Sequence, residues 1–480
     1  MFLALLLAAV AFASFSPALR GDFVAWDDNI NIYENPHIQT LDAAHWRWML
    51  TNETYMRRYQ PLVWINYALL HHFWGFNPFP FHLEDLLFHA ANTFLLFWLI
   101  RRLLLLAFKP AENSVSVLVS AAMATLFWAV HPLRAETVSW ASGDNYSQCV
   151  MFALAALLAY LHAMSNGVEM PAWKTFPYWL AIVLFALSLL TYPVVIAFLA
   201  VLLMLDIFLL RRVPLSLSKW WNDPVARRTL LEKLPFMLLT LVFAFIAKQA
   251  ANTGQYSLWR TSYGLHVAVS QSFFIWAYYL WKPWVPIHVS PIYTTLVNFD
   301  PATWYFSVSA AGVLSLGWLG WVYRRKIPLL LALYVCHIAL LVPMLGLTEN
   351  PHYPSDRFDY CVGLLWPVFI AFGLFKYWEN KPRRNAALIF LLGTLPVFAV
   401  MSFQQAKIWR NSATLFQAGI ARLGHDPYRV NLYYRLAAYY ERTGRADLAA
   451  EQYWTILNIS PQSEEARKAL TRLHQQGAVR

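Results

Sequence analysis

Long apolar runs, separated by short polar segments, dominate the hydrophobic pattern of this chain. A helix needs about 20 mostly apolar residues to cross a bilayer, whereas the strands of a β-barrel show short alternating segments. The pattern therefore predicts an all-α polytopic membrane protein. The candidate membrane helices are residues 1–19, 81–106, 115–130, 146–163, 176–190, 193–210, 234–250, 266–282, 303–322, 327–346, 361–378 and 386–402.

Two of these candidates need a separate interpretation. Residues 1–19 are either a retained helix or a signal peptide, because the stretch from Ala11 to Ala13 resembles a cleavage site. No basic residue precedes the apolar run, so we expect a retained helix. Residues 266–282 contain Gln271 and two serines, which makes them the weakest candidate. We interpret them as a partly re-entrant or interfacial segment, which leaves about 11 crossings.

Composition and charge support this class and predict its topology. Hydrophobic residues form 59% of the chain and charged residues 13%, with a net charge of +11. The basic clusters lie beside apolar runs, as in cytoplasmic loop ends, so we expect no nucleic-acid partner. With 11 crossings and Lys and Arg preferred in cytoplasmic loops, the topology has residues 211–233 and 376–385 inside, and residues 20–80 and 403–480 outside. We expect an integral, multi-pass protein of a bacterial inner membrane, with an extracytoplasmic C-terminus.

Two adjacent carboxylates, Asp27 and Asp28, follow the first membrane helix in the extracytoplasmic loop 20–80. Neighbouring negative charges repel each other, which raises the pKa of one group and suits a general base. The alternative is a helix N-cap or a solvated turn, where Asp is also common. The pair is therefore a candidate catalytic site.

Other predicted outside segments carry charged groups close to the ends of membrane helices. Arg134 and Glu136 follow one helix, Arg357 precedes another, and Lys282 ends the segment 266–282. Basic side chains at such places hold a lipid-linked phosphate through charge-assisted hydrogen bonds. The alternatives are an ion pair between Arg134 and Glu136, and snorkelling of the long side chains to lipid headgroups.

Three polar residues share one face of a predicted helix. His82, Asp85 and His89 are spaced by three and four positions, which brings them to the same side. They form either a metal site or a polar contact between helices. We favour the polar contact, and we expect no metal and no other cofactor, because no carboxylate cluster beyond Asp27 and Asp28 is visible.

Several motifs together resemble one family. They span nearly the whole chain and are similar to those of the membrane-embedded C-type (GT-C) glycosyltransferases, most closely the transmembrane-and-tetratricopeptide-repeat (TPR) O-mannosyltransferases and their bacterial relatives. The motifs are Phe23 to Asp28, Glu34 to His37, Tyr59 to Leu62, Phe81 to Leu83, His89 to Asn92, His131 to Glu136, Leu205-Asp206 before Arg211-Arg212, Tyr279 to Trp281 with Pro283, and Tyr353 to Arg357.

The C-terminal segment resembles the same family independently. Its residues follow the 34-residue tetratricopeptide pattern, with about one and a half repeats. The matching residues are Tyr433, Leu436, Ala437, Tyr440, Gly444, Ala449, Tyr453 and Pro461. We therefore expect a GT-C-like transmembrane glycosyltransferase domain at 1–405 and a TPR-like helical region at 406–480, which offers a surface for a protein partner.

The resemblance implies an enzyme that transfers mannose or another hexose from a polyprenyl-phosphate-linked donor. The acceptor would be a hydroxyl of a protein or glycan, most simply of Ser or Thr, and transfer would invert the anomeric centre on the outer face of the lipid bilayer. The resemblance implies catalysis by Asp27 and Asp28. From the positions of the basic groups we expect Arg58, Arg134, Arg357 and Lys282 to bind the donor phosphate. We expect His131, Glu136, His82 and His89 to support the site.

Two segments depart from the family pattern. Ser142 to Tyr146 replace a Gly-Arg-Ala-Asp-like or Glu-Arg-Lys-Asp-like run, and Thr191 to Pro193 replace Ser-Lys-Glu. Both departures leave the donor sugar open more than the class of reaction. The alternative functions are a non-enzymatic polyprenyl-lipid carrier or flippase, and an assembly scaffold that acts through its repeats.

Overall fold

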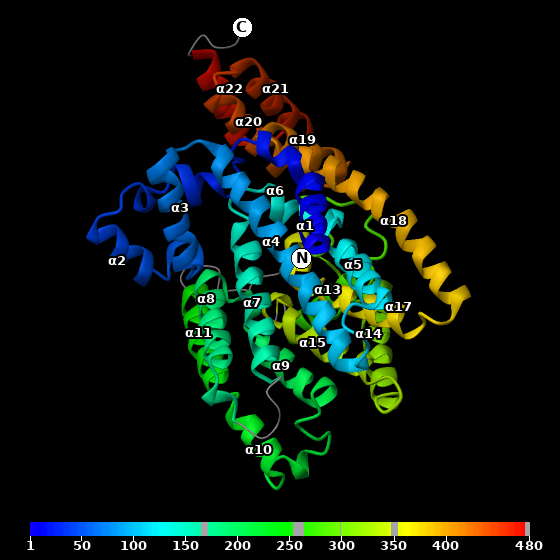
Figure 1. Ribbon diagram of the computed structural model, residues 1–480. Coiled ribbons are helices and arrows are strands. Elements are labelled where there is room, and N and C mark those ends of the chain that lie inside the picture. Colours follow the sequence, from blue (N-terminus) through cyan, green and yellow to red (C-terminus); the bar gives the residue numbers. More distant parts are fainter. Residues whose placement is uncertain (165–170, 253–263, 298, 347–353, 476–480) are drawn as a thin grey trace.

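The computed structural model describes residues 1–164, 171–252, 264–297, 299–346 and 354–475. Within these ranges the regular elements are helices and no strand occurs (Figure 1). The predicted all-α class is therefore confirmed for this part of the chain.

Most of the chain forms a helical bundle around one large apolar core. Helices α1, α4, α5, α7 and α8 contribute many of its fully buried residues. The bundle helices are α1 (Phe2–Phe15), α4 (Pro78–Phe108), α5 (Val115–Ala129), α6 (Ala135–Ser139), α7 (Asp144–Ala163), α8 (Phe176–Thr191), α9 (Phe198–Met204), α10 (Pro224–Leu231), α11 (Leu234–Asn252), α13 (Gly264–Trp281), α14 (Trp304–Val322), α15 (Pro328–Leu341), α16 (Asp359–Val362), α17 (Leu365–Lys376) and α18 (Lys381–Ile408).

Many of these helices have the length and composition of membrane spans. Six described helices qualify individually, and the number rises to eight if each of two bent pairs counts as one span. Three further apolar helices are shorter. These helices indicate a multi-pass membrane protein. The predicted 11 crossings require every bent pair and every shorter helix to cross, so that count stays a prediction.

The first loop folds into its own small aromatic core. It contains α2 (Ala43–Thr51) and α3 (Pro61–Trp74), and α3 begins at a proline, which suits the first helical position. The ring of His37 stacks on Trp48 with centroids 4.1 Å apart, and Trp48 packs beside the buried Trp64. This core holds the loop against the end of the bundle.

The C-terminal region consists of four helices in series, α19 (Ser412–Leu423), α20 (Arg429–Arg442), α21 (Ala446–Ile459) and α22 (Glu464–Gln475). Each helix packs on the next. Gly424 and Gly444 have positive φ angles of 57° and 73° at two of the turns, where glycine is favoured. The helices agree with the predicted helical region, while its assignment as a TPR-like unit stays a prediction.

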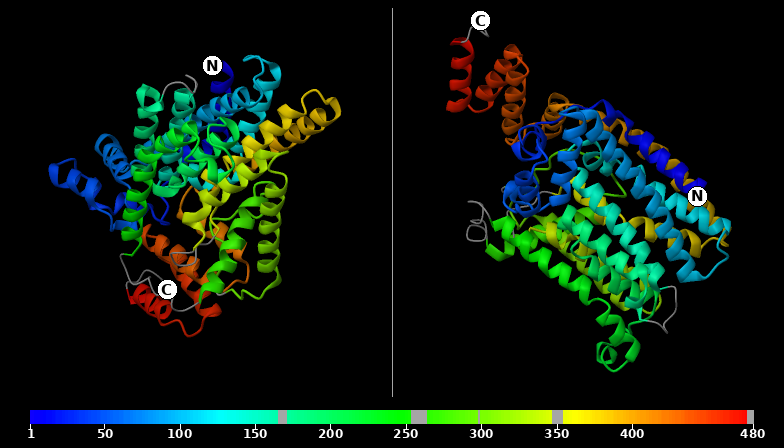
Figure 2. Two further views of the ribbon diagram at one scale, coloured as in Figure 1. Left: turned by 90° about the horizontal axis from the view of Figure 1, so that it is seen from below. Right: turned by 60° about the vertical axis from the view of Figure 1, so that its left-hand side comes forward.

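The loop and the C-terminal region lie at the same end of the molecule. Figure 1 shows α19 to α22 at the top, α2 and α3 on the left in the upper half, and α10 at the bottom. In the right-hand view of Figure 2 the C-terminal helices project beyond the bundle next to the first loop. Helix α18 leads from the C-terminal region along the side of the bundle.

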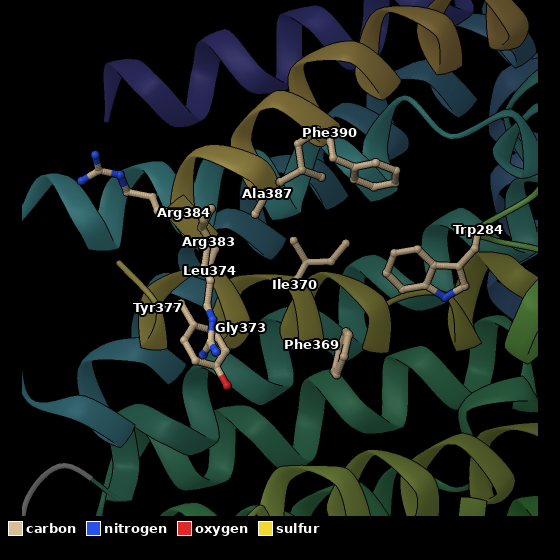
Figure 3. Close-up of a pocket in the computed structure, with 11 residues that line it drawn as sticks. Trp284, Phe369, Ile370, Gly373, Leu374, Tyr377, Arg383, Arg384, Ala387 and Phe390 are labelled. Atoms are coloured by element: carbon tan, nitrogen blue, oxygen red, sulfur yellow. The ribbon is translucent and has the colours of Figure 1, made fainter. Parts of the chain in front are cut away.

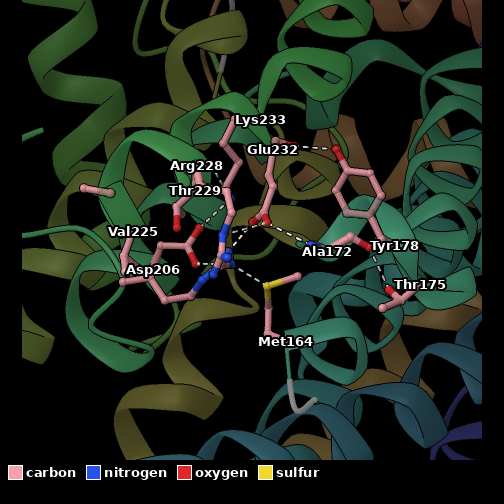
Figure 4. Close-up of polar contacts among 12 residues, drawn as sticks. Met164, Ala172, Thr175, Tyr178, Asp206, Val225, Arg228, Thr229, Glu232 and Lys233 are labelled. Atoms are coloured by element: carbon pink, nitrogen blue, oxygen red, sulfur yellow. Dashed lines mark hydrogen bonds and ion pairs between the residues drawn. The ribbon is translucent and has the colours of Figure 1, made fainter. Parts of the chain in front are cut away.

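A buried ionic cluster joins the helices near the other end (Figure 4). Asp206 accepts a hydrogen bond from the Tyr160 hydroxyl at 2.7 Å and pairs with Lys233 at 2.6 Å and Arg212 at 3.2 Å. Arg212 also pairs with Glu232. Each charged side chain of the cluster has a partner of opposite charge. The cluster therefore connects helices and leaves none of these charges free for a ligand.

Candidate functional site

Asp28 connects the first loop to the segment that follows Trp140. Its Oδ2 accepts a hydrogen bond from the Val24 N–H at 2.7 Å. Its Oδ1 accepts bonds from the N–H and the hydroxyl of Ser142, at 3.0 and 2.6 Å. The carboxyl is fully buried, and burial raises its pKa from 3.8 to about 7, against the opposing effect of these bonds. Repulsion by Asp27 contributes less, so the cause proposed from sequence is secondary.

Asp27 has different surroundings from its neighbour. Its side chain is half-buried, and its carboxylate forms no hydrogen bond or ion pair with any residue that the structure describes. Its charge acts on the guanidinium groups of Arg58 and Arg357. Of the two carboxylates, Asp27 is thus the one available to a substrate, and Asp28 anchors the backbone beside it.

Arg58 is one of the two cations on which the Asp27 charge acts. It follows a turn in which Met56 and Arg57 have φ angles of 53° and 57°, a left-handed conformation that is costly for these residues. Arg57 holds the turn by donating from Nε to the Ala251 carbonyl at 3.0 Å. Arg58 forms no ion pair with the described residues, and its guanidinium lies 5.9 Å from the ring centroid of Tyr192.

Two tyrosines complete the surroundings of Arg58. The rings of Tyr146 and Tyr192 meet edge to face with centroids 5.0 Å apart. They come from the segments 142–146 and 191–193, which depart from the family pattern. Neither Tyr146 nor Tyr192 was assigned to the site from the sequence. The departure of both segments from the family pattern was the feature of the sequence that could have indicated them.

Arg357 is held by Glu136. Its Nη1 donates to Oε1 at 2.6 Å, and its backbone N–H donates to Oε2 at 2.9 Å. The guanidinium also lies 5.7 Å from the Trp140 ring centroid and keeps part of its surface exposed. The pair predicted as an alternative, Arg134 with Glu136, does not form, because Arg357 occupies both carboxylate oxygens.

The structure places Arg134 and Lys282 in closed environments. Arg134 is 1% exposed and pairs with the buried Asp359. Lys282 is 3% exposed and donates to the Ile287 carbonyl at 2.7 Å. Three aromatic rings surround its ammonium group, and burial lowers its pKa. In this conformation neither cation is presented to a phosphate.

The histidines and Glu136 serve packing and pairing in this structure. His89 bonds to the Tyr360 hydroxyl at 2.9 Å and to the Ala129 carbonyl at 2.8 Å, a polar contact between helices. His131 bonds to the Pro283 carbonyl at 2.8 Å. His82 is buried against Gly21, where an added Cβ would lie 2.8 Å from its ring. No three His, Cys, Asp or Glu side chains come together as metal ligands among the described residues.

The C-terminal region contacts the backbone that leads into the acidic pair from the N-terminal side. The Asp22 N–H donates to the Arg410 carbonyl at 2.7 Å, and the Ala25 N–H donates to the Ser412 hydroxyl at 2.8 Å. Trp409 stacks on Trp140 with centroids 5.8 Å apart. The start of this region is therefore part of the support of the candidate site.

Comparison with known proteins finds similar sequences among animal transferases. Protein O-mannosyl-transferase TMTC4 of the mouse is 26% identical over 186 residues, which cover 37% of this chain and 25% of that protein. Human TMTC2 is 28% identical over 35% of this chain and 20% of that protein. Human TMTC1 is 22% identical, and the match covers 96% of this chain and 56% of that protein. The family resemblance inferred from the motifs is confirmed.

The extent of these matches is limited. The chain spans at most about three-fifths of the length of these curated relatives. No family model matches the chain, and no solved structure matches it. These relatives come from mouse and human, so they lend no support to the expectation of a bacterial membrane.

Proposed function

We propose that this chain, a distant homologue of proteins named as protein O-mannosyl-transferases, transfers a hexose from a polyprenyl-phosphate-linked donor to a Ser or Thr hydroxyl of a protein. The observation that carries the proposal is one carboxylate without a partner among the described residues, Asp27, whose charge acts on two cations, Arg58 and Arg357. A glycosyl transfer from a phosphate needs these two elements, a base for the acceptor and positive charge for the leaving group.

The reaction follows from this arrangement in one displacement. Asp27 accepts the proton of the acceptor hydroxyl as its oxygen attacks the anomeric carbon. The bond between that carbon and the phosphate oxygen breaks, and the lipid phosphate leaves with the bonding electron pair. Arg58 and Arg357 stabilise the negative charge that develops on it. A single displacement inverts the anomeric centre and needs no covalent enzyme intermediate.

The surrounding residues position these groups. Asp28 fixes the backbone next to Asp27 through Val24 and Ser142. Glu136 holds Arg357 in place through two hydrogen bonds. With 11 crossings this site faces outward at the membrane surface, and the C-terminal region lies beside it as a docking surface for the protein acceptor.

The experiment uses the full chain purified in detergent, a synthetic polyprenyl-phosphate mannose and a Ser/Thr peptide. We expect Asp27→Asn to reduce turnover more than about 100-fold, the scale of a lost general base. Asp22→Asn is the matched control, because Asp22 lies in the same segment and is exposed. Product is measured by mass spectrometry of the peptide, with other hexose donors tested in parallel. Full turnover by Asp27→Asn would exclude the proposed base and favour the carrier or scaffold functions.

A further inference from the structure

A groove lies between α17 and α18, away from the candidate site. Its volume is about 210 Å³, and Trp284 stands at one end while Tyr377 and Arg383 stand at the other (Figure 3). Helix α18 has 28 residues and is therefore about 42 Å long. The groove includes the first part of this helix, and the candidate site lies beyond its last residue.

The walls of the groove suit a hydrocarbon chain. Phe369, Ile370 and Phe390 line it between its two ends (Figure 3), and Phe390 is 54% exposed. Gly373 also lines the groove, and a Cβ at this position would meet no atom within 4 Å. The free space there is thus large enough for atoms of a ligand.

The polar end of the groove carries positive charge. Arg383 and Arg384 lie in the first turn of α18, where the helix dipole adds to their charge. Neither forms an ion pair with a described carboxylate. Arg383 lies 4.9 Å from the Tyr377 ring centroid and Arg384 lies 5.4 Å from that of Trp378. Arg384 also bonds to Asn385 at 3.2 Å, so its guanidinium keeps donors for a further acceptor.

We propose that this groove binds one acyl chain of an anionic phospholipid, with the lipid phosphate held by Arg383 and Arg384. The apolar walls match the hydrocarbon, and the two guanidinium groups match the negative headgroup. Such a lipid belongs to the bilayer and is distinct from the sugar donor. The site lies along the first part of α18, away from the candidate catalytic site, and does not depend on the proposed reaction.

The test measures lipid binding to the full chain in detergent by native mass spectrometry. Dioleoyl-phosphatidylglycerol is the anionic probe and dioleoyl-phosphatidylcholine is the neutral one. We expect wild type to retain one phosphatidylglycerol at least about tenfold more tightly than phosphatidylcholine, because the charge-assisted bonds are lost with the neutral headgroup. The double variant Arg383→Gln, Arg384→Gln should lose this preference.

Two further comparisons separate a built site from general surface charge. Gly373→Leu fills the groove and should weaken phosphatidylglycerol binding about tenfold or more, whereas Gly393→Leu on α18 should not, since position 393 does not line the groove. Arg324→Gln with Arg325→Gln removes another basic pair, of which Arg324 lies over the Trp321 ring. Neither residue lines this groove, so binding should also stay unchanged.

The proposal fails under either of two outcomes, provided that the variants keep the wild-type unfolding temperature. Equal loss from the two arginine pairs would show attraction by any basic surface. Full binding by Gly373→Leu would show that no acyl chain occupies the groove. Because an added Cβ at Gly373 or at Gly393 would meet no atom within 4 Å, neither substitution is expected to unfold the chain.

Discussion

Asp27 and Asp28 are neighbours in the sequence, yet the fold places their carboxylates in different surroundings. Asp28 is enclosed and accepts three hydrogen bonds, while Asp27 accepts none from the described residues and its charge acts on Arg58 and Arg357. A base must exchange its proton with a substrate, and a carboxylate whose oxygens are occupied by the protein does this poorly. The two residues therefore carry separate tasks.

The two tasks predict a specific pH dependence of stability. The Asp28 carboxyl has a pKa of about 7 in the folded chain and about 3.9 in the unfolded chain. Between these values the unfolded chain has released its proton and the folded chain keeps it, so stability falls as the pH rises. We expect the unfolding temperature of the full chain in detergent to fall from pH 5 to pH 8, and to fall less in Asp28→Asn. The control Asp22→Asn should keep the wild-type slope, and equal slopes in all three would contradict the assignment.

The open and closed arginines predict opposite phenotypes. Arg58→Gln should raise the donor KM about 10- to 150-fold without unfolding the chain, because a charge-assisted contact of about 1.5–3 kcal/mol is lost. Arg134→Gln leaves Asp359 buried without its partner, a change that costs about 3–5 kcal/mol. It should therefore lower the unfolding temperature instead. Donor kinetics and thermal unfolding are measured for both variants. If Arg134→Gln kept its unfolding temperature and had a raised donor KM, Arg134 would be a donor-binding residue and not a structural one.

Residue identity alone predicted which groups are candidates but not how they pair. Arg134 and Glu136 are two positions apart, and a local pair was a natural hypothesis. In the fold, Arg134 meets Asp359 and Glu136 meets Arg357, contacts that span 225 and 221 positions. They depend on how α6 packs against the segment before α17. No local pattern encodes that packing, so the choice of partner needed the structure.

At the scale of elements, the apolar runs predicted most bundle helices well, because burial in lipid or protein demands the same continuous hydrophobicity. Breaks were harder to predict. Residues 193–210 form one apolar run, but the structure divides them into a 3₁₀ turn, the short α9 and a π-helical turn. The final turn carries Asp206 into the buried ionic cluster. The π-helical turn occurs where Asp206 forms its ion pairs, and the hydrophobic periodicity of the sequence does not show such a turn.

The end of α18 and the start of α19 predict a sharp effect of truncation. Trp409 stacks on Trp140, and Ser412 holds the Ala25 N–H, so both support the site directly. A chain that ends at residue 405 should lose activity even on a small acceptor. A chain that ends at Gly424 keeps these contacts and should retain that activity, while it works poorly on a protein acceptor that docks on α20 to α22. Both truncated chains are assayed with a peptide and with a protein acceptor. Wild-type activity of both chains on both acceptors would show that this region neither supports the site nor docks the protein acceptor.

At the scale of the whole molecule, the two ends differ in character. The end with α2, α3 and the C-terminal helices carries the candidate reaction, and the opposite end carries α10 and the buried ionic cluster (Figures 1 and 4). If the chain crosses the membrane as its charge distribution predicts, the lipid-linked donor is used on the outer side, and the basic segments 211–233 and 376–385 lie on the inner side. The orientation of the chain therefore decides on which side of the membrane the proposed reaction takes place.

Cysteine labelling tests this orientation directly. The natural cysteines Cys149, Cys336 and Cys361 are buried, so they contribute little background. Lys219 and Lys468 are exposed. Lys219 precedes α10 and Lys468 belongs to α22, and Figure 1 shows these two helices at opposite ends of the molecule. With an odd number of crossings and 211–233 inside, an impermeant maleimide should label Lys468→Cys in intact cells and should label Lys219→Cys only after the membrane is opened. Labelling of Lys219→Cys alone would invert the topology. It would place Asp27 on the inner side, where the donor would have to be presented from the cytoplasmic leaflet.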